Sequence, residues 1–258
     1  MRPVLIVHPT CPASRDLIKA LRSAGFLDEF EVVVADNQAI AFKWRTWSVP
    51  WIVVNDRPAA GDPIGLDEIE ALLEGRGIPP RDPVEAFKTA VMHSSFASSV
   101  MVVAGSIKPL LNDDFLSAAT RQPLTGVSVS AVADALLSRS REIYEELVDK
   151  SVRLLGVGYV RELYWASGGA IRSEEVEKYA EPHLVAAWVM AKASIGRVGI
   201  PINPMGALRN IAEEIAEFVQ RSSRGLLNKV KAEYEEIYVD KEYMALLEKY
   251  LGSRQFSN

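Results

Sequence analysis

Cysteine and histidine are scarce in this chain: its 258 residues include one cysteine, Cys11, and three histidines. A single cysteine excludes a disulfide within the chain, and so few sulfur and nitrogen ligands argue against a zinc site. Because disulfides persist mainly in oxidising compartments, we expect this chain in a reducing cytoplasm. We also predict no bound metal and no resident cofactor.

A large excess of one charge is also missing. The formal net charge is −5 at pH 7, and 24% of the residues are charged. Proteins that bind nucleic acid need a basic surface to neutralise phosphates. This balance therefore argues against nucleic acid as a partner.

Acidic and basic residues are absent from residues 89–107, whose sequence is TAVMHSSFASSVMVVAGSI. The length of this stretch approaches that of a bilayer span, but it contains five serines and a histidine. We therefore predict one or two buried core helices and no membrane span. The apolar density of residues 86–111 leaves two alternatives open, a thick helical core or a self-association surface that forms a homodimer.

Hydrophobic periodicity indicates an α/β organisation for residues 4–75. Short runs rich in valine and isoleucine alternate with helical stretches, which predicts the order β-α-β-α-β-β-α. Because a βαβ unit comes first, we expect the first two strands to be parallel. The predicted strands are 4–7, 30–35, 51–54 and 57–64, and the predicted helices are 11–23, 38–47 and 66–74.

The pattern changes after residues 75–83, which read GRGIPPRDP. Such a density of glycine and proline is typical of a linker. We therefore predict an α/β domain at 1–76, a linker at 77–82 and an all-helical domain at 83–258, with no further strand.

One long helix is expected within the helical part. Ser128 or Ser130 is a suitable N-cap for it, and apolar residues follow at helical spacing. Gly156 and Gly158 are expected to end it, because glycine interrupts helices readily.

The segment His8-Pro9-Thr10-Cys11-Pro12-Ala13-Ser14 lies between the first predicted strand and the first predicted helix. A thiol there meets the positive end of the helix dipole and unpaired N–H groups of the first turn. Both effects lower the pKa of a thiol from about 8.5 and favour the nucleophilic thiolate. Cys11 is therefore the predicted reactive residue, with Pro12 at the first helical position. The alternative is a small buried core residue.

Ser14 stands three residues after Cys11, where a dithiol redox site carries a second cysteine. Its hydroxyl can hydrogen-bond a thiolate but cannot resolve a mixed disulfide, so the predicted site needs an outside thiol. His8 is an auxiliary candidate, as a base or a cation near the thiol. A purely structural role stays open for both residues.

Pro50 directly precedes a predicted strand. A cis X–Pro bond costs about 0.5–1 kcal/mol, against about 2.5–4 kcal/mol at other residues, so a cis turn requires proline. We predict that the Val49–Pro50 bond is cis and lies beside Cys11. The N–H and C=O of Val49 would then be open to an extended peptide or a γ-glutamyl tripeptide. The alternative is an ordinary loop proline.

Residues 4–75 resemble the thioredoxin superfamily. The motif Cys-Pro-Ala-Ser at residues 11–14 is similar to the Cys-Pro-x-Cys or Cys-Pro-x-Ser of glutaredoxins and of cysteine-type glutathione transferases. The segment GLDEI at residues 65–69 resembles the Gly-x-Asp-Asp-Leu segment of glutaredoxins, which binds the γ-glutamyl carboxylate of glutathione. The resemblance implies a thioredoxin-like domain whose substrate is flanked by Gly65, Leu66 and Asp67. The predicted substrate site also includes Pro12, Val49 and Pro50.

Three functions are consistent with these residues. The first is a monothiol thiol–disulfide oxidoreductase or thiol-transfer protein, in which Cys11 attacks a protein or small-molecule disulfide. Glutathione or another small thiol would be the co-substrate. The second is a non-catalytic adaptor, in which a thioredoxin-like scaffold carries helices that bind another protein. The third is a glutathione-type transferase, because a thioredoxin-like domain precedes a helical domain in that family too.

Overall fold

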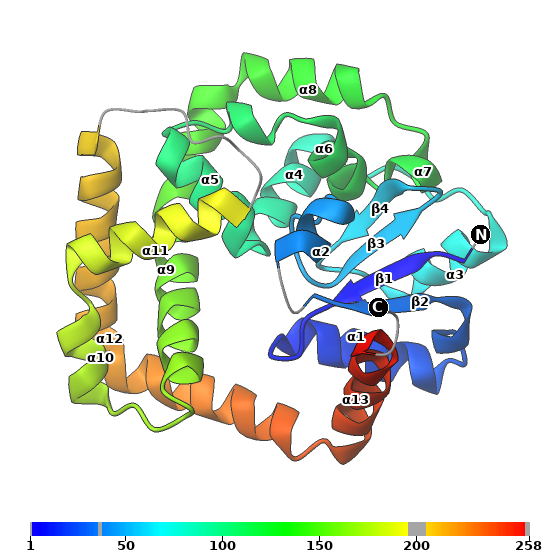
Figure 1. Cartoon of the computed structure of the whole chain (residues 1–258). Helices are drawn as coiled ribbons and strands as arrows, with labels where there is room; N and C mark the ends of the chain where they lie inside the picture. The colour runs from blue at the N-terminus through cyan, green and yellow to red at the C-terminus, as the bar shows by residue number, and fades with distance from the viewer. Residues whose placement is uncertain (1, 36–37, 196–204, 256–258) are drawn as a thin grey trace. The chain divides into compact units, whose positions relative to one another are not determined.

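The computed structural model describes residues 2–35, 38–195 and 205–255 (Figure 1). It divides into two compact units. The sheet unit joins Met1–Ser94, Leu111–Ala135 and Glu236–Asn258, and the helical unit joins Ser95–Leu110 and Leu136–Glu235. The predicted boundary at 77–82 does not coincide with this division. That segment lies inside the sheet unit, where the Ile78 N–H donates to the Leu124 carbonyl at 3.0 Å.

The sheet unit contains a mixed four-stranded sheet in the order β2-β1-β3-β4. β1 pairs with β2 in parallel, whereas β3 is antiparallel to both β1 and β4. The predicted order β-α-β-α-β-β-α and the parallel first pair are therefore confirmed. The strands are β1 (Val4–Val7), β2 (Glu31–Val34), β3 (Trp51–Val54) and β4 (Arg57–Gly61).

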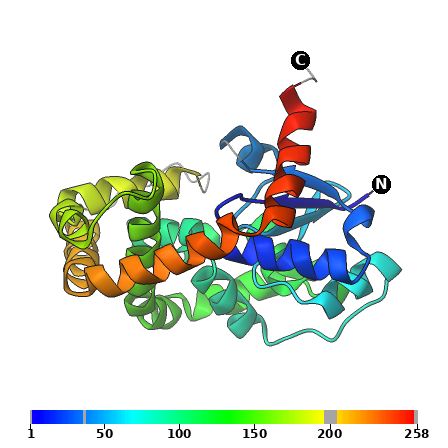
Figure 2. The same ribbon diagram turned by 90° about the horizontal axis from the view of Figure 1, so that it is seen from below.

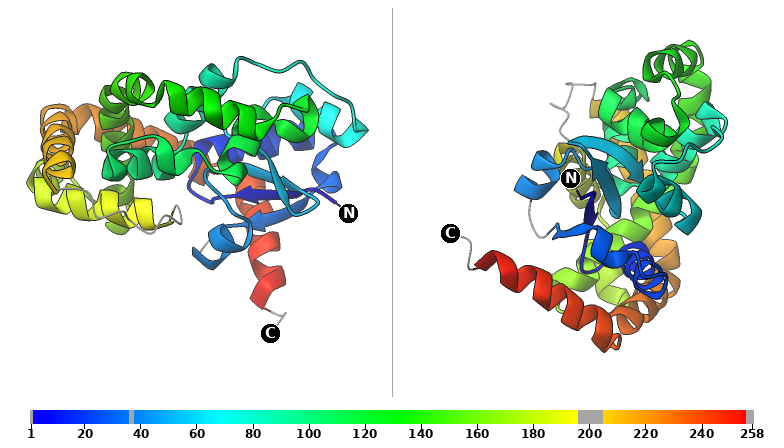
Figure 3. Two further views of the ribbon diagram at one scale, coloured as in Figure 1. Left: turned by 90° about the horizontal axis from the view of Figure 1, so that it is seen from above. Right: turned by 90° about the vertical axis from the view of Figure 1, so that its right-hand side faces the viewer.

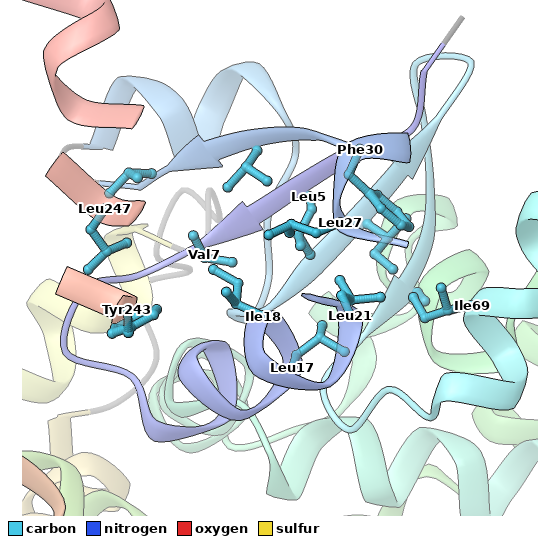
Figure 4. Packing of buried hydrophobic residues seen from close by; sticks show 14 of the residues in the cluster. Leu5, Val7, Leu17, Ile18, Leu21, Leu27, Phe30, Ile69, Tyr243 and Leu247 are labelled. Atoms are coloured by element: carbon cyan, nitrogen blue, oxygen red, sulfur yellow. The ribbon is translucent and has the colours of Figure 1, made fainter. Parts of the chain in front are cut away.

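One hydrophobic core of the sheet unit joins the first and the last parts of the chain. Leu5 and Ile52 of the sheet pack with Leu21 of α1 (Pro12–Ser23) and with Leu247 of α13 (Lys241–Gln255). Figure 4 shows these strands and helices around the labelled side chains. α13 contacts β2 and α1 (Figure 2), so the C-terminal helix belongs to the sheet unit.

The sheet unit also contains helices from the middle of the chain. α6 (Asp113–Thr120) packs against β4, where the Ser117 hydroxyl donates to the Pro58 carbonyl at 2.8 Å. The ring of Phe115 on α6 makes edge contacts with Trp47 and Phe87. The further helices of the sheet unit are η1 (Leu27–Glu29), α2 (Gln38–Lys43), α3 (Leu66–Glu74), α4 (Pro83–Met92), α6 (Asp113–Thr120) and α7 (Gln122–Thr125).

The helical unit is built around α5 (Ser95–Ala104), which packs against α9 (Ser140–Ala166) and α11 (Pro182–Ile195) (Figure 3). No strand follows β4 in the described residues, as predicted. The elements of this unit are α5 (Ser95–Ala104), η2 (Lys108–Leu110), α9 (Ser140–Ala166), α10 (Ser173–Tyr179) and α11 (Pro182–Ile195). α8 (Val129–Ser138) and α12 (Met205–Tyr238) each contribute residues to both units.

The predicted long helix is wrong in two respects. The chain breaks at Arg139 into α8 and α9, and α9 continues through Gly156 and Gly158. A Cβ atom at Gly156 would lie 2.6 Å from the ring of Phe218. At Gly158 it would lie 3.1 Å from the ring of Trp188. These glycines therefore let large rings approach the helix and do not end it.

The uncharged stretch 89–107 forms parts of two ten-residue helices, α4 and α5. This agrees with the prediction of one or two buried core helices. Within the described ranges, no helix combines the length and the apolar character of a membrane span.

Candidate functional site

Cys11 occupies the N-cap position of α1, directly after the turn that leaves β1. Its N–H donates to the His8 carbonyl at 3.1 Å, and its own carbonyl accepts from the Arg15 N–H at 3.1 Å. Pro12 begins the helix, as predicted, and the thiol is partly exposed. The expected position of Cys11 at the positive end of α1 is confirmed, whereas its reactivity stays a prediction.

The turn opposite Cys11 contains the predicted cis bond between Val49 and Pro50. The Cys11 Sγ–H donates to the Val49 carbonyl oxygen at 3.3 Å. The structure therefore brings these three residues together. It corrects one expectation, because the thiol already engages the carbonyl that was expected to be open to a substrate. This hydrogen bond exists only while the sulfur carries its proton.

Ser14 and His8 join the end of β1 to the start of α1. The Ser14 side chain is fully buried, and its oxygen accepts a hydrogen bond from the His8 N–H at 3.2 Å. The Nδ1 atom of His8 faces Thr10, whose N–H donates to it at 3.3 Å. These contacts give both residues structural roles, while their predicted roles toward a thiolate stay predictions.

Tyr243 of α13 is a neighbour of the site that the sequence did not reveal. Its hydroxyl donates to the His8 carbonyl at 3.3 Å, across 235 positions of the chain. The Cys11 N–H binds the same carbonyl. Burial and the nearby Cys11 raise the pKa of Tyr243, and Asp240 adds to this effect while Arg15 opposes it. Tyr243 therefore remains a protonated donor at pH values where thiols ionise.

The start of α3 holds the three residues implied by the resemblance. Gly65 is the N-cap, and Leu66 and Asp67 are exposed. The Gly65 N–H donates to the carboxylate of Glu68 at 3.3 Å, and Glu68 is only 3% exposed. A carboxylate of the chain itself therefore occupies a donor in the segment that the resemblance assigns to a ligand carboxylate.

A second cis bond, Asp62–Pro63, connects the cysteine side of the site to α3. The Asp62 N–H donates to the Pro50 carbonyl and to the Ser48 hydroxyl, each at 3.2 Å. The guanidinium of Arg121 donates to the Pro63 carbonyl. The two cis turns are thus linked through hydrogen bonds.

Arg121 and Glu68 form a buried ion pair behind these turns. The Nε atom of Arg121 lies 3.1 Å from the Glu68 carboxylate, and the two side chains are 6% and 3% exposed. Burial lowers the pKa of Arg121, while the charge and hydrogen bond of Glu68 act in the opposite direction. Arg81 binds the same carboxylate at 2.8 Å. No local sequence pattern pairs Arg121 with Glu68, so sequence reasoning missed it.

We expect His93→Gln to remove a small pH dependence of stability. The Asp62 carboxylate accepts a hydrogen bond from the Nδ1 atom of protonated His93 at 3.1 Å, and this bond raises the pKa of His93. The contribution is therefore complete below about pH 6.5, the unfolded pKa, and is lost as the pH rises through the higher folded pKa. Because the imidazole is 46% exposed, we expect less than about 1 kcal/mol. Urea unfolding at about pH 6 and about pH 8 measures it. An unchanged pH dependence in the variant would contradict this assignment.

The chemistry available at this site is that of one thiol. In the part of the chain that the structure describes, no group of three or more His, Cys, Asp or Glu residues is placed to hold a metal ion. Comparison with known proteins finds no matching family model and no significantly similar curated protein or solved structure. The site is therefore interpreted from its own geometry.

Proposed function

We propose that the sheet unit has a thioredoxin-like fold and that the chain is a monothiol thiol–disulfide oxidoreductase or thiol-transfer protein. The strand order β2-β1-β3-β4 supports the fold proposal. The observation that carries the function is the position of Cys11 at the N-terminus of α1, where its side chain faces the Val49–Pro50 segment. The thiol of this N-cap residue lies against a backbone segment that we propose aligns a substrate chain.

The proposed reaction needs one disulfide and one outside thiol. The Cys11 thiolate attacks one sulfur of the substrate disulfide, forms a mixed disulfide with it and expels the other sulfur as a thiolate. A second thiolate, from glutathione or another thiol, then attacks the substrate sulfur of the mixed disulfide and restores Cys11. Ser14 has no sulfur, so the second step cannot occur within the chain.

We propose a reducing cytoplasm as the location of the protein, because free thiols that could serve as the outside thiol persist there. The identity of the outside thiol is a separate question. The Glu68 carboxylate already binds the Gly65 N–H, which weighs against a glutathione carboxylate at this point. We therefore propose another small thiol or a protein thiol as the outside thiol. The homodimer stays a prediction.

The test is trapping of a mixed disulfide. We expect the purified protein to form a disulfide-linked adduct with a peptide disulfide at a rate that saturates below about pH 8.5, the usual thiol pKa. Added thiol should release the adduct. The matched control is Cys11→Ser, which replaces one sulfur by oxygen and should form no adduct. Intact-protein mass spectrometry detects the adduct directly, because the chain has one cysteine.

The adaptor is the second candidate, and it is favoured by the engagement of the thiol with the Val49 carbonyl. It predicts a thiol pKa at or above about 8.5 and no adduct at neutral pH. Either of these results would contradict the thiol-transfer proposal. The glutathione-type transferase predicts retention on immobilised glutathione and its loss when Val49 or Asp67 is altered.

A further inference from the structure

The C-terminal helix brings a hydrogen-bond donor to the turn that carries Cys11. The Tyr243 hydroxyl and the Cys11 N–H both donate to the His8 carbonyl, at 3.3 Å and 3.1 Å. Figure 4 shows that Tyr243 projects from α13 beside the loop between β1 and α1. Tyr243 is 2% exposed, so its side chain is shielded from water.

The position of Tyr243 is fixed by a backbone hydrogen bond at the start of α13 and by packing in the hydrophobic core. The carboxylate of Asp240 accepts a hydrogen bond from the Tyr243 N–H at 3.1 Å. This carboxylate also forms an ion pair with Lys19 of α1 at 2.8 Å. Leu247, one helical turn further along α13, belongs to the same core cluster as Tyr243. The hydroxyl is therefore held beside the start of α1.

We propose that Tyr243 supplies a hydroxyl hydrogen bond to the Cys11 thiolate. The inference deepens the proposed function and rests on it. Ionisation removes the proton that Cys11 donates to the Val49 carbonyl, so the sulfur changes from a donor to an acceptor. A charged acceptor forms hydrogen bonds roughly twice as strong as a neutral one.

The present bond of the Tyr243 hydroxyl is easily exchanged. At 3.3 Å it is long for an O–H···O hydrogen bond, whose usual distance is about 2.7–2.8 Å. The His8 carbonyl also keeps the Cys11 N–H as a donor after the hydroxyl turns away. Exchange of a weak bond to a carbonyl for a stronger one to the thiolate is therefore favourable.

Titratable groups around this hydroxyl lie on α1, at the residue before α13 and in the loop between β1 and α1. Arg15 of α1 interacts with Tyr243 but is paired with Asp16 and Glu236 at the surface. Asp240, which directly precedes α13, is paired with Lys19. The His8 ring belongs to the loop before α1 and bonds to Thr10. These charges are largely paired, which leaves the Tyr243 hydroxyl as a donor directed at the Cys11 turn.

The test is the pH dependence of Cys11 alkylation by iodoacetamide in the full chain. We expect Tyr243→Phe to raise the apparent pKa of the thiol by about one unit and to slow alkylation about tenfold below that pKa. The ring is kept, so far-UV circular dichroism and the unfolding midpoint should show a folded protein. The matched control is Tyr250→Phe on the same helix, which lines a cavity with Arg22 and Asp28 and should leave the profile unchanged.

The outcomes separate this inference from the proposed function. If the wild-type thiol is reactive and Tyr243→Phe has the same profile, the inference is overturned and the proposed function stands. If the wild-type pKa is ordinary but Tyr243→Phe still raises it, the inference stands and the thiol-transfer function fails. An equal shift in Tyr250→Phe would also overturn the inference, because the effect would then not depend on the hydroxyl beside Cys11.

Discussion

Replacement of Arg121 by methionine is expected to lower the free energy of unfolding by about 3 kcal/mol. Arg121 is 5% exposed and donates to the Glu68 carboxylate and to the Pro63 and Ala118 carbonyls. Without it, the buried carboxylate keeps only Arg81 of its two arginine partners, and the Arg81 side chain is 60% exposed. The cost arises mainly from leaving a buried charge with poor compensation.

Urea unfolding of two further variants makes this prediction specific. Arg76→Met removes an exposed pair with Glu74, at 2.8 Å, and should lower the free energy of unfolding much less than Arg121→Met. The double variant Arg121→Met, Glu68→Gln should recover part of the loss, because the unpaired charge is gone. If Arg121→Met lowered the free energy of unfolding no more than Arg76→Met, the buried pair would not be needed for stability.

The first part of the fold could be predicted because its signals are local. The run from Val4 to Val7 and the segment at 51–54 show strands within a few residues, and Pro12 shows a helix start. The cis bond at Pro50 was also predictable, since a proline before a strand is a local feature. Cys11 could be placed at the start of α1 for the same reason.

The return of the C-terminal helix to the sheet could not be predicted in this way. The contacts of Tyr243 with His8 and of Asp240 with Lys19 join residues more than 200 positions apart. An apolar stripe shows that a helix buries one face but does not identify the surface that receives it. The predicted domain boundary therefore followed the glycine and proline content at 75–83, whereas the structure groups the chain by packing.

The glycines of α9 show a similar limit. Gly156 in a sequence is a weak helix former, and the local prediction was a helix end. In the structure the close approach of Phe218 gives Gly156 a packing role, and this ring comes from α12. The propensity was correct, but tertiary packing outweighed it.

Leu247→Ala is expected to destabilise the sheet unit by about 2–4 kcal/mol. Leu247 is 2% exposed and belongs to the cluster that contains Val7 and Ile18. The truncation removes packed methyl groups and leaves a cavity between α13 and the sheet. If the C-terminal helix is an integral part of the sheet unit, this lost packing must also lower the stability of the strands near the N-terminus.

Hydrogen exchange distinguishes this result from local fraying. Amides of β1 and β2 should exchange faster in Leu247→Ala, in proportion to the loss of unfolding free energy, because global opening controls core strands. Glu248→Ala changes the adjacent, exposed residue of the same helix and should leave these rates within about twofold. Faster exchange confined to α13 would show instead that this helix opens independently and is not part of the cooperative core of the sheet unit.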